Sequence, residues 1–377
     1  MIIEDEPSQP KRILALDGGG VRGIVTIAFL ERMEQELRTA LDKPQLVLSD
    51  HFDLIGGTSV GSIIATMLAL GWPMEKVKTT FQRWCPEIFG RAIALGVFRS
   101  RFDAHELEKR LDETLGRMTL ADSALKTRLA IVTKRMDTGS PWWIVSNNPA
   151  SQWWDGKEPG HRNKDLKLAE LIRASTAAPT VFEPKRLPIE ADRPYGTFID
   201  GGVSPFNNPA LALLMFARMK GHGLEWPLSP DKLQLVSVGT GIWRDLVHYG
   251  FVQRKISAWF GVVALRTMIT DAQTLSLTIL QWISSPRRPW RINGEIGDMA
   301  GDVLGIGPGP CAPLIQFQRY DLSLEADTLA PMMPAGKPPS AWKLDRLRSL
   351  DNPGQLETLY QLAKKEAATQ VDVRDFL

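Results

Sequence analysis

The feature that most constrains this chain is a serine placed between an apolar segment and a helical one. The run Phe52-Asp53-Leu54-Ile55 leads into Gly57-Thr58-Ser59-Val60-Gly61, and an apolar helical pattern begins at Ser62. This is the G-x-S-x-G pattern in the strand-to-helix context that a nucleophile elbow requires. Such a turn strains its central residue and brings neighbouring backbones close together, so glycines are needed beside it. The alternative is an ordinary strand-to-helix turn in which Ser59 caps the helix.

A glycine loop upstream has the same context. Arg12 to Asp17 forms a short, mostly apolar run typical of a buried strand, Gly18-Gly19-Gly20-Val21-Arg22-Gly23 follows, and a helical pattern extends to about Leu41. A strand, a glycine turn and a helix, repeated twice, predict a βαβ unit. The expected fold class is therefore α/β, with a mainly parallel sheet and helices on both of its faces.

The spacing Gly18-x-Gly20-x-x-Gly23 also fits the dinucleotide fingerprint, which is typical of oxidoreductases. Backbone N–H groups at a helix N-terminus suit either a pyrophosphate or the oxyanion of a tetrahedral intermediate. A dinucleotide site also needs an acidic residue at the end of the second strand, where this sequence has Gly57-Thr58-Ser59. The oxyanion-hole interpretation is favoured, and a dinucleotide-binding oxidoreductase is the weaker alternative.

Ser59 needs a proton acceptor, and Asp200 is the best placed one. Asp200 follows the short apolar strand Thr197-Phe198-Ile199 and precedes Gly201-Gly202, so its carboxylate is expected to point back over the sheet. A carboxylate with an ordinary pKa of ~4 is a poor base for a hydroxyl. A desolvated carboxylate that is hydrogen-bonded to the serine accepts the proton as attack proceeds. The alternatives are an ordinary Asp-Gly turn and a Ser–Asp–His triad completed by His222.

Taken together, these motifs resemble the patatin-like phospholipases. Three of them occur in the order of that family: Asp17 to Gly23, Gly57 to Gly61 and Asp200 to Gly202. Further segments also resemble the family: Ala174 to Pro179, Asn207 to Pro209 and Ser237 to Gly241. The resemblance covers about residues 11–245. It implies a three-layer α/β/α fold and a lipid acyl hydrolase of the phospholipase A type.

The resemblance also implies a role for each motif. Ser59 is the implied nucleophile and Asp200 the implied general base of a Ser–Asp dyad. The oxyanion hole is implied at Gly18, Gly19, Gly20, Arg22 and Gly23. The resemblance further implies that this dyad cleaves fatty acyl esters of membrane phospholipids through an acyl-serine intermediate, with no cofactor or metal. Two roles stay open for Arg22: stabilising negative charge at the substrate, or pairing with a carboxylate to hold the loop. Ser175 is expected to pack and hydrogen-bond rather than attack.

The 377 residues are 44% hydrophobic and 23% charged, which predicts a folded chain with a sizeable core. Residues 1–10 are expected to be a polar leader, 11–245 the catalytic domain, and 246–377 a C-terminal cap of helices and loops packed on the same core. Within the catalytic domain, a strand at 126–134 is expected to pair with one at 142–145. Within the cap, helices are expected over about 255–283 and from Gln355 to about Ala368.

Composition narrows the partners and the compartment. A net charge of +2 gives no electrostatic case for a nucleic acid polymer. Cys85 and Cys311 form neither a disulfide framework nor a metal-ligand spacing. The N-terminus has no signal-peptide pattern, and no apolar run approaches the ~20 residues of a membrane span. We therefore expect a cytoplasmic protein, peripheral at the inner face of the membrane.

Tryptophans near loops indicate contact with a membrane surface. The tryptophans concerned are Trp142, Trp143, Trp153, Trp154, Trp282 and Trp290, and the last two bracket a segment with Arg287 and Arg288. Tryptophan with arginine suits a headgroup region, although core packing is the alternative for each ring. The expected partners are the phospholipid substrate, the membrane and a second copy of the chain. Some bacterial members of the resembled family are antiphage lipases switched on by cyclic oligonucleotides, so such an activator, acting on residues 246–377, is a further alternative.

Overall fold

The computed structural model describes residues 9–90, 102–145, 148–155, 162–188, 195–244, 257–305, 311–333 and 336–377. The strands of these residues are β1 (Lys11–Leu16), β2 (Leu54–Thr58), β3 (Arg128–Arg135), β4 (Pro141–Val145), β5 (Lys185–Leu187), β6 (Gly196–Asp200), β7 (Leu233–Val238) and β8 (Gln316–Tyr320). They form one 8-stranded sheet in the order β5-β6-β3-β2-β1-β7-β8, with β4 also paired to β3. The strands from β3 to β8 along this order are parallel, whereas β4, β5 and β6 pair antiparallel. The predicted α/β class is confirmed, as is the predicted pairing of β3 with β4.

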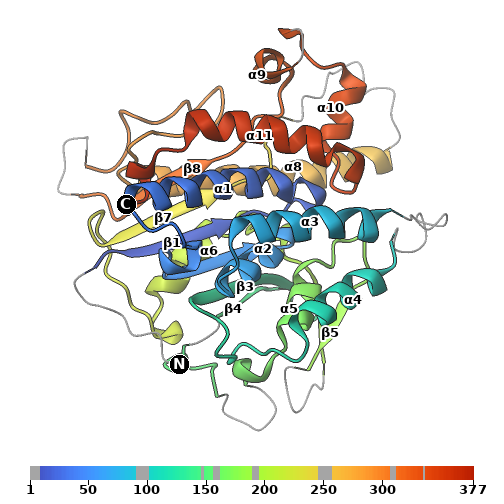
Figure 1. Ribbon diagram of the computed structural model, residues 1–377, viewed down its shortest axis with the longest axis vertical. Coiled ribbons are helices and arrows are strands. Elements are labelled where there is room, and N and C mark those ends of the chain that lie inside the picture. The colour runs from blue at the N-terminus through green and yellow to red at the C-terminus, as the bar shows by residue number, and fades with distance from the viewer. Residues whose placement is uncertain are drawn as a thin grey trace.

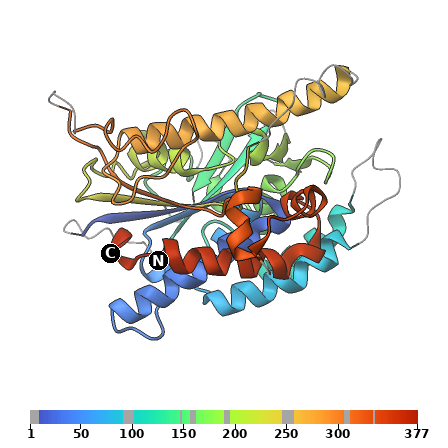
Figure 2. The same ribbon diagram turned by 90° about the horizontal axis from the view of Figure 1, so that it is seen from above.

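Helices cover both faces of the sheet and make three layers. They are α1 (Gly23–Ala40), α2 (Val60–Ala69), α3 (Met74–Phe89), α4 (Ala104–Leu115), α5 (Leu168–Ser175), α6 (Ala210–Arg218), α8 (Ser257–Trp282), α9 (Ala326–Leu329), α10 (Ala341–Arg348) and α11 (Leu356–Gln370). Figure 2 shows α8 on one side of the sheet and α11 on the other. Apolar residues of α6 and α8 form the core on the first face, and those of α1 to α5 and α11 form the core on the second.

The central strands are apolar on both faces because both faces are covered. In β1, Ile13 and Ala15 pack into the core under α6, while Leu14 and Leu16 pack into the core under α1. Successive strand residues point to opposite faces, so a continuous apolar run fits a strand between two helical layers. This explains why the sequence pattern identifies β1 with nearly correct bounds.

The residues after 245 build on the same sheet and helices. β8 pairs with β7 in parallel, and α11 lies along α1 (Figure 1). The sequence interpretation of this part as helices and loops alone was wrong, because it missed β8. The proposed boundary at 245 and most of the leader 1–10 fall outside the described residues, so the division into domains stays a prediction. Among the residues that the structure describes, no helix is both long and apolar enough to span a bilayer.

Two strands meet end to end along one edge of β3. Parallel β2 pairs with β3 as far as Val132, and antiparallel β6 pairs with β3 from Thr133 onward. β4 pairs with residues 130–134 of β3, so it occupies the opposite edge, and β6 must share the edge that β2 uses. The carboxyl ends of β2 and β6 therefore face each other across neighbouring residues of one strand. This arrangement brings Ser59 and Asp200 together.

Candidate active site

Ser59 occupies a strained turn between β2 and α2. Its φ of 54° and ψ of −125° lie in a region that L residues rarely adopt. A Cβ atom at Gly57 would overlap the backbone of Gly61, and one at Gly61 would overlap the carbonyl of Leu16. The two glycines of the motif are therefore required by close backbone packing. Ser59 itself stays partly exposed.

The Ser59 hydroxyl donates a hydrogen bond to Oδ2 of Asp200 at 2.6 Å, which is the contact that the sequence predicts. The other carboxylate oxygen, Oδ1, accepts the backbone N–H of Gly202 at 2.6 Å. Asp200 is only 4% exposed. Burial raises the pKa of Asp200 to about 6, although the hydrogen bonds from Ser59 and Gly202 lower it. The carboxylate is thus both a stronger base than an exposed aspartate and largely ionised at neutral pH.

His222, which the triad alternative requires, packs elsewhere. Its ring lies 3.8 Å from the ring of Phe216 and 4.6 Å from that of Trp153, between centroids. Burial lowers the pKa of His222 to about 4. These contacts belong to a neutral histidine packed against aromatic rings, which favours the dyad over the triad.

Two further serines hold the elbow. The buried hydroxyl of Ser175, at the end of α5, accepts the backbone N–H of Ser59 at 2.8 Å and donates to the carbonyl of Val132 at 2.7 Å. The hydroxyl of Ser62 donates to the carbonyl of Ser59 at 2.6 Å. Ser175 therefore hydrogen-bonds and packs, as its sequence context predicts. Ser62 was not singled out from the sequence, although a serine three residues after Ser59 is placed to bond the Ser59 carbonyl.

The glycine loop passes beside Ser59. A Cβ atom on Gly18 would lie 3.3 Å from Cβ of Ser59. The N–H of Gly18 donates to the carbonyl of Asn207 at 3.0 Å, so it is already engaged. Within the described residues the N–H groups of Gly19 and Gly20 have no acceptor, which makes them the available donors of this loop. Gly20 has a φ of 58°, and a Cβ there would overlap the carbonyl of Leu350.

Arg22 and Gly23 support the loop rather than line it. The buried guanidinium of Arg22 donates to the carbonyl of Gly241 at 3.0 Å and lies 4.6 Å from the centroid of the Trp243 ring. Gly23 begins α1, where a Cβ would lie 2.7 Å from Cγ2 of Val60. Of the two roles that the sequence leaves open for Arg22, these contacts favour holding the loop.

The two glycines after Asp200 also occupy crowded positions. A Cβ atom on Gly201 would lie 2.5 Å from the carbonyl oxygen of Val132 in β3. One on Gly202 would lie 3.0 Å from Oδ1 of Asp200, the oxygen that the N–H of Gly202 binds. Small residues at both positions let the chain turn while Asp200 stays close to β3.

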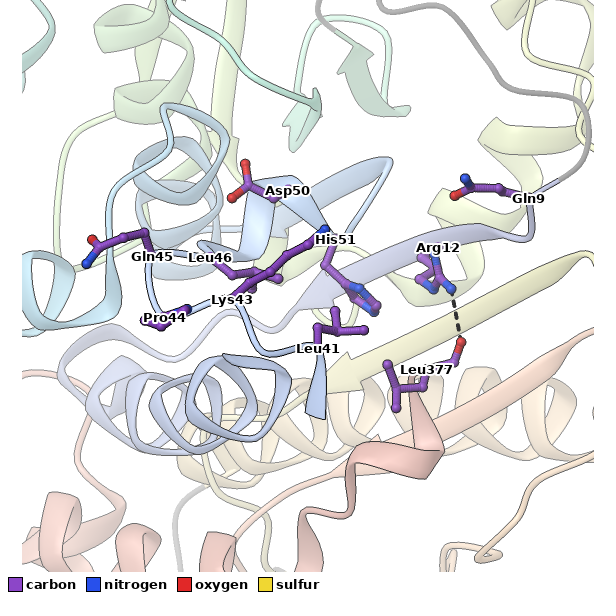
Figure 3. A pocket seen from close by; sticks show the side chains of 10 residues that line it. All are labelled: Gln9, Arg12, Leu41, Lys43, Pro44, Gln45, Leu46, Asp50, His51 and Leu377. Carbon is purple, nitrogen blue, oxygen red and sulfur yellow. Dashed lines mark hydrogen bonds between the residues drawn. The ribbon is translucent and has the colours of Figure 1, made fainter. Parts of the chain in front are cut away.

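A separate cavity of about 640 Å³ lies at the amino-terminal ends of β1 and β2, the ends opposite Ser59 (Figure 3). Its lining residues are Gln9, Arg12, Leu41, Lys43, Pro44, Gln45, Leu46, Asp50, His51 and Leu377. Arg12 donates to the carbonyl of Leu377 at 2.9 Å, and His51 bonds the carbonyl of Phe376 at 2.6 Å. Neither Ser59 nor Asp200 lines this cavity, so it is not the site of the dyad.

Residues 14–214 match the family model described as patatin-like phospholipase. The chain belongs to the patatin-like phospholipase family. The matched region contains Ser59, Asp200 and the glycine loop, in the order that the sequence resemblance implies. Membership in a family of lipid acyl hydrolases decides against the dinucleotide-binding oxidoreductase.

Patatin-like proteins of quite different organisms are similar to this chain. A cGAMP-activated phospholipase of Vibrio cholerae is 32% identical over 62% of this chain and 70% of that protein. A patatin of Solanum tuberosum is 29% identical over 61% of this chain and 60% of that protein. Among solved structures, human GIVD cytosolic phospholipase A2 has a TM-score of 0.46 at 12% identity, over 97% of this chain and 59% of that one. The chain therefore spans from 60% to 70% of these curated relatives.

Sequence reasoning missed the residues that reach this patatin-like site from the C-terminal part. Gln273 in α8 donates to Asp17, and Arg319 in β8 does so as well. Both lie outside the residues that match the family model. Neither sits in a motif, and the pattern Gln-Phe-Gln-Arg-Tyr around Arg319 suggests an exposed segment rather than a buried one.

Proposed function

We propose that this chain is a phospholipase of the A type, in which Ser59 and Asp200 form the catalytic dyad. The observation that supports this most directly is the 2.6 Å hydrogen bond from the Ser59 hydroxyl to the buried Asp200 carboxylate. In the first step the hydroxyl oxygen attacks the carbonyl carbon of a fatty acyl ester while its proton passes to Asp200. The ester oxygen of the lysophospholipid then leaves with that proton, and the acyl chain stays on Ser59.

Deacylation repeats the same chemistry with water as the nucleophile. Asp200 accepts a proton from the water that attacks the acyl-serine, and Ser59 leaves as the protonated hydroxyl. Both steps pass through an oxyanion, for which we propose the N–H groups of Gly19 and Gly20 as donors. Donors that are fixed before the reaction stabilise this charge without reorganising, and this is a main source of rate enhancement in acyl transfer. In this proposal Gly18, Arg22 and Gly23 hold the loop, and Gly57 and Gly61 hold the elbow.

The test is chemical labelling together with product analysis. An activated fluorophosphonate is expected to label Ser59, and phospholipid vesicles are expected to yield free fatty acid and lysophospholipid. Ser59→Ala should lose both results, because the attacking hydroxyl is removed. The turn itself should remain, because its glycines are unchanged. Ser62→Ala, which removes a neighbouring hydroxyl, should still be labelled at Ser59. Labelling at Ser175, or undiminished hydrolysis by Ser59→Ala, would refute the proposal.

We also propose that α8 contacts the bilayer that contains the substrate. Met268, Leu275 and Trp282 are spaced by seven residues, and they are 66%, 60% and 46% exposed, so they form one apolar stripe on the helix. On the same helix, Gln273 bonds Asn207 and Asp17, next to the glycine loop. A lipase whose substrate lies in a bilayer needs an apolar surface close to its site. A cytoplasmic enzyme at the inner membrane face fits this proposal.

The other tryptophans near loops divide between surface and core. Trp154 is buried, Trp290 is half-buried against the core beside α6 and α8, and Trp153 is exposed. The side chains of Trp142 and Trp143 lie outside the described residues. The interfacial contribution proposed here therefore rests on Trp282 and not on the tryptophans as a group.

Activation by a cyclic oligonucleotide is a second proposal, and the relative from Vibrio cholerae motivates it. That protein is described as a cGAMP-activated phospholipase. On this proposal the chain acts as an antiphage effector, and cGAMP raises its rate of phospholipid hydrolysis. Full hydrolysis without any nucleotide, unchanged across protein concentration, would refute it. Light scattering with and without cGAMP tests the expected homo-oligomer in the same samples.

A further inference from the structure

A buried ion cluster behind the glycine loop joins residues that are far apart in the sequence. Arg319 in β8 is 2% exposed, and its guanidinium donates to the two carboxylate oxygens of Asp17 at 2.9 Å and 2.7 Å. It also donates to Asp321 at 2.7 Å and to the hydroxyl of Ser237 at 2.7 Å. A bidentate pair of this kind fixes both the position and the plane of a carboxylate.

Asp17 immediately precedes Gly18, so fixing its carboxylate fixes the start of the glycine loop. Asn208 and Gln273 also donate to Asp17, at 2.9 Å and 3.2 Å. The carbonyl of Asn207, beside Asn208, accepts the N–H of Gly18 at 3.0 Å. The loop is therefore held both through the Asp17 side chain and through the Gly18 backbone.

Asp321 extends the cluster to the far side of the loop. It accepts the N–H of Gly241 at 2.7 Å, and the carbonyl of Gly241 accepts the guanidinium of Arg22 at 3.0 Å. The hydroxyl of Thr240 donates to the carbonyl of Gly18 at 2.8 Å. The loop is thus held by two segments, one at Asn207 and Asn208 and the other at Thr240 and Gly241. Arg319 connects them, because it binds Asp17 on the side of the first and Asp321 on the side of the second.

We propose that Arg319 is a positioning residue for the oxyanion hole, so that β8 completes the active site from outside the residues that match the family model. This rests on the proposed function, because the oxyanion donors are those proposed above. Arg319 acts through Asp17. Without the guanidinium, two buried carboxylates repel each other and the N–H groups of Gly19 and Gly20 lose their alignment. An interaction needed only in the transition state affects kcat and leaves substrate binding unchanged.

The kinetic test uses Arg319→Met, Arg319→Lys, Asp17→Asn and the double variant Arg319→Met/Asp17→Asn with a soluble p-nitrophenyl ester. Arg319→Met is expected to lower kcat by ~10²-fold, the order of losing one oxyanion-hole donor, with KM little changed. Arg319→Lys keeps the charge and should lower kcat less, by roughly 10-fold. The kcat of the double variant should be no lower than that of the less active of the two single variants, because the two side chains act as one unit.

Glu34→Gln is the matched control for a lost buried ion pair. Glu34 in α1 is 2% exposed, pairs with Arg38 at 2.7 Å and accepts the N–H of Met74 at 3.2 Å. These partners belong to α1 and α3 and not to the glycine loop. Glu34→Gln should lose stability in the same manner as the Arg319 variants and keep the wild-type kcat.

Hydrogen exchange gives a second readout that needs no catalysis. Amide exchange in the peptide that carries residues 17–23 is expected to be faster in Arg319→Lys than in wild type, and unchanged in Glu34→Gln. A wild type that hydrolyses no ester either with or without cGAMP refutes the proposed function, and the exchange result still decides whether Arg319 holds the loop. An unchanged kcat, an increase in KM alone, multiplicative losses in the double variant or unchanged exchange would each overturn the inference. If Arg319→Met does not fold, Arg319→Lys and Asp17→Asn decide by the same criteria.

Discussion

The backbone N–H of Ser59 points at the hydroxyl of Ser175, 2.8 Å away, and this hydroxyl in turn binds the carbonyl of Val132 in β3. Ser175→Ala removes the acceptor of the Ser59 N–H and one donor to the Val132 carbonyl, at a cost of about 1–3 kcal/mol for each group left unsatisfied. It also loosens the strained turn, and small misplacements of a nucleophile are costly. We expect ester hydrolysis to fall by roughly 10-fold, while fluorophosphonate still labels Ser59.

The control for this change is Ser276→Ala. Ser276 is buried in α8, and its hydroxyl donates to the carbonyl of Ala272 at 2.9 Å, away from the elbow. The Ser276→Ala variant should hydrolyse ester at the wild-type rate. Loss of all labelling in Ser175→Ala, or an equal loss of rate in both variants, would contradict a supporting role for Ser175.

Asp200→Asn tests the base. The substitution keeps the volume of the side chain and removes the proton acceptor, so we expect kcat to fall by ~10²–10⁴-fold, the range of general base catalysis. His222→Gln should cost little, because its ring packs against Phe216 and Trp153 rather than taking the proton. Steady-state kinetics on a soluble ester measure both. If His222→Gln were as inactive as Ser59→Ala, the result would support the Ser–Asp–His triad and contradict the dyad.

The pH profile should report the raised pKa of Asp200. In the folded chain burial raises this pKa from its ordinary 3.8 to about 6, so the carboxylate becomes a base only as pH rises through about 6. We expect kcat/KM to rise with pH, with an inflection near this value, and to level off above it. The inflection should vanish in Asp200→Asn. A flat profile in wild type from pH 5 to 8 would contradict Asp200 as the base.

The raised pKa of Asp200 also affects stability, but this contribution falls with pH whereas activity is expected to rise. The folded chain binds this proton more tightly than the unfolded chain, so the stabilisation is fully present below 3.8 and is lost as pH rises through about 6. The difference corresponds to roughly 3 kcal/mol. We therefore expect the free energy of unfolding of Asp200→Asn, relative to that of wild type, to be more favourable at pH 8 than at pH 4. Denaturant titrations at both pH values measure this difference. Asp17 titrates in the same range, since burial raises its pKa to about 6, but it is present in both proteins.

The apolar stripe on α8 predicts a defect limited to membrane substrate. Met268→Ser/Leu275→Ser/Trp282→Ser should weaken vesicle binding by about 10-fold or more, since each exposed side chain would bury apolar area in the bilayer. Hydrolysis of a soluble ester should not change. Met136→Ser/Leu41→Ser/Trp342→Ser replaces the same residue types at other exposed positions and is the control. Wild-type vesicle binding by the α8 variant would refute the contact, and a changed mass in light scattering would assign the stripe to a second copy.

The catalytic half of the fold can be predicted from the sequence because its signals are local. The apolar run before the glycine loop indicates β1, and the glycines beside Ser59 and Asp200 mark positions where the structure has no room for a side chain. β8 could not be predicted in this way. Arg319 makes the strand look exposed, and it is buried only because it meets Asp17, 302 positions away, and Asp321. The local sequence around Arg319 cannot show that its charge is paired with a residue so far away along the chain.

The end-to-end meeting of β2 and β6 on β3 bears on how this protein tolerates change. Ser59 and Asp200 lie 141 positions apart in the chain, yet their separation in space is set by two adjacent residues, Val132 and Thr133. Loops added or shortened anywhere between them leave that spacing alone, provided that the three strands keep their register. Changes to the segments between β2 and β6 can therefore alter the surface around the site of this chain, while the register of the strands keeps Ser59 and Asp200 at the same distance.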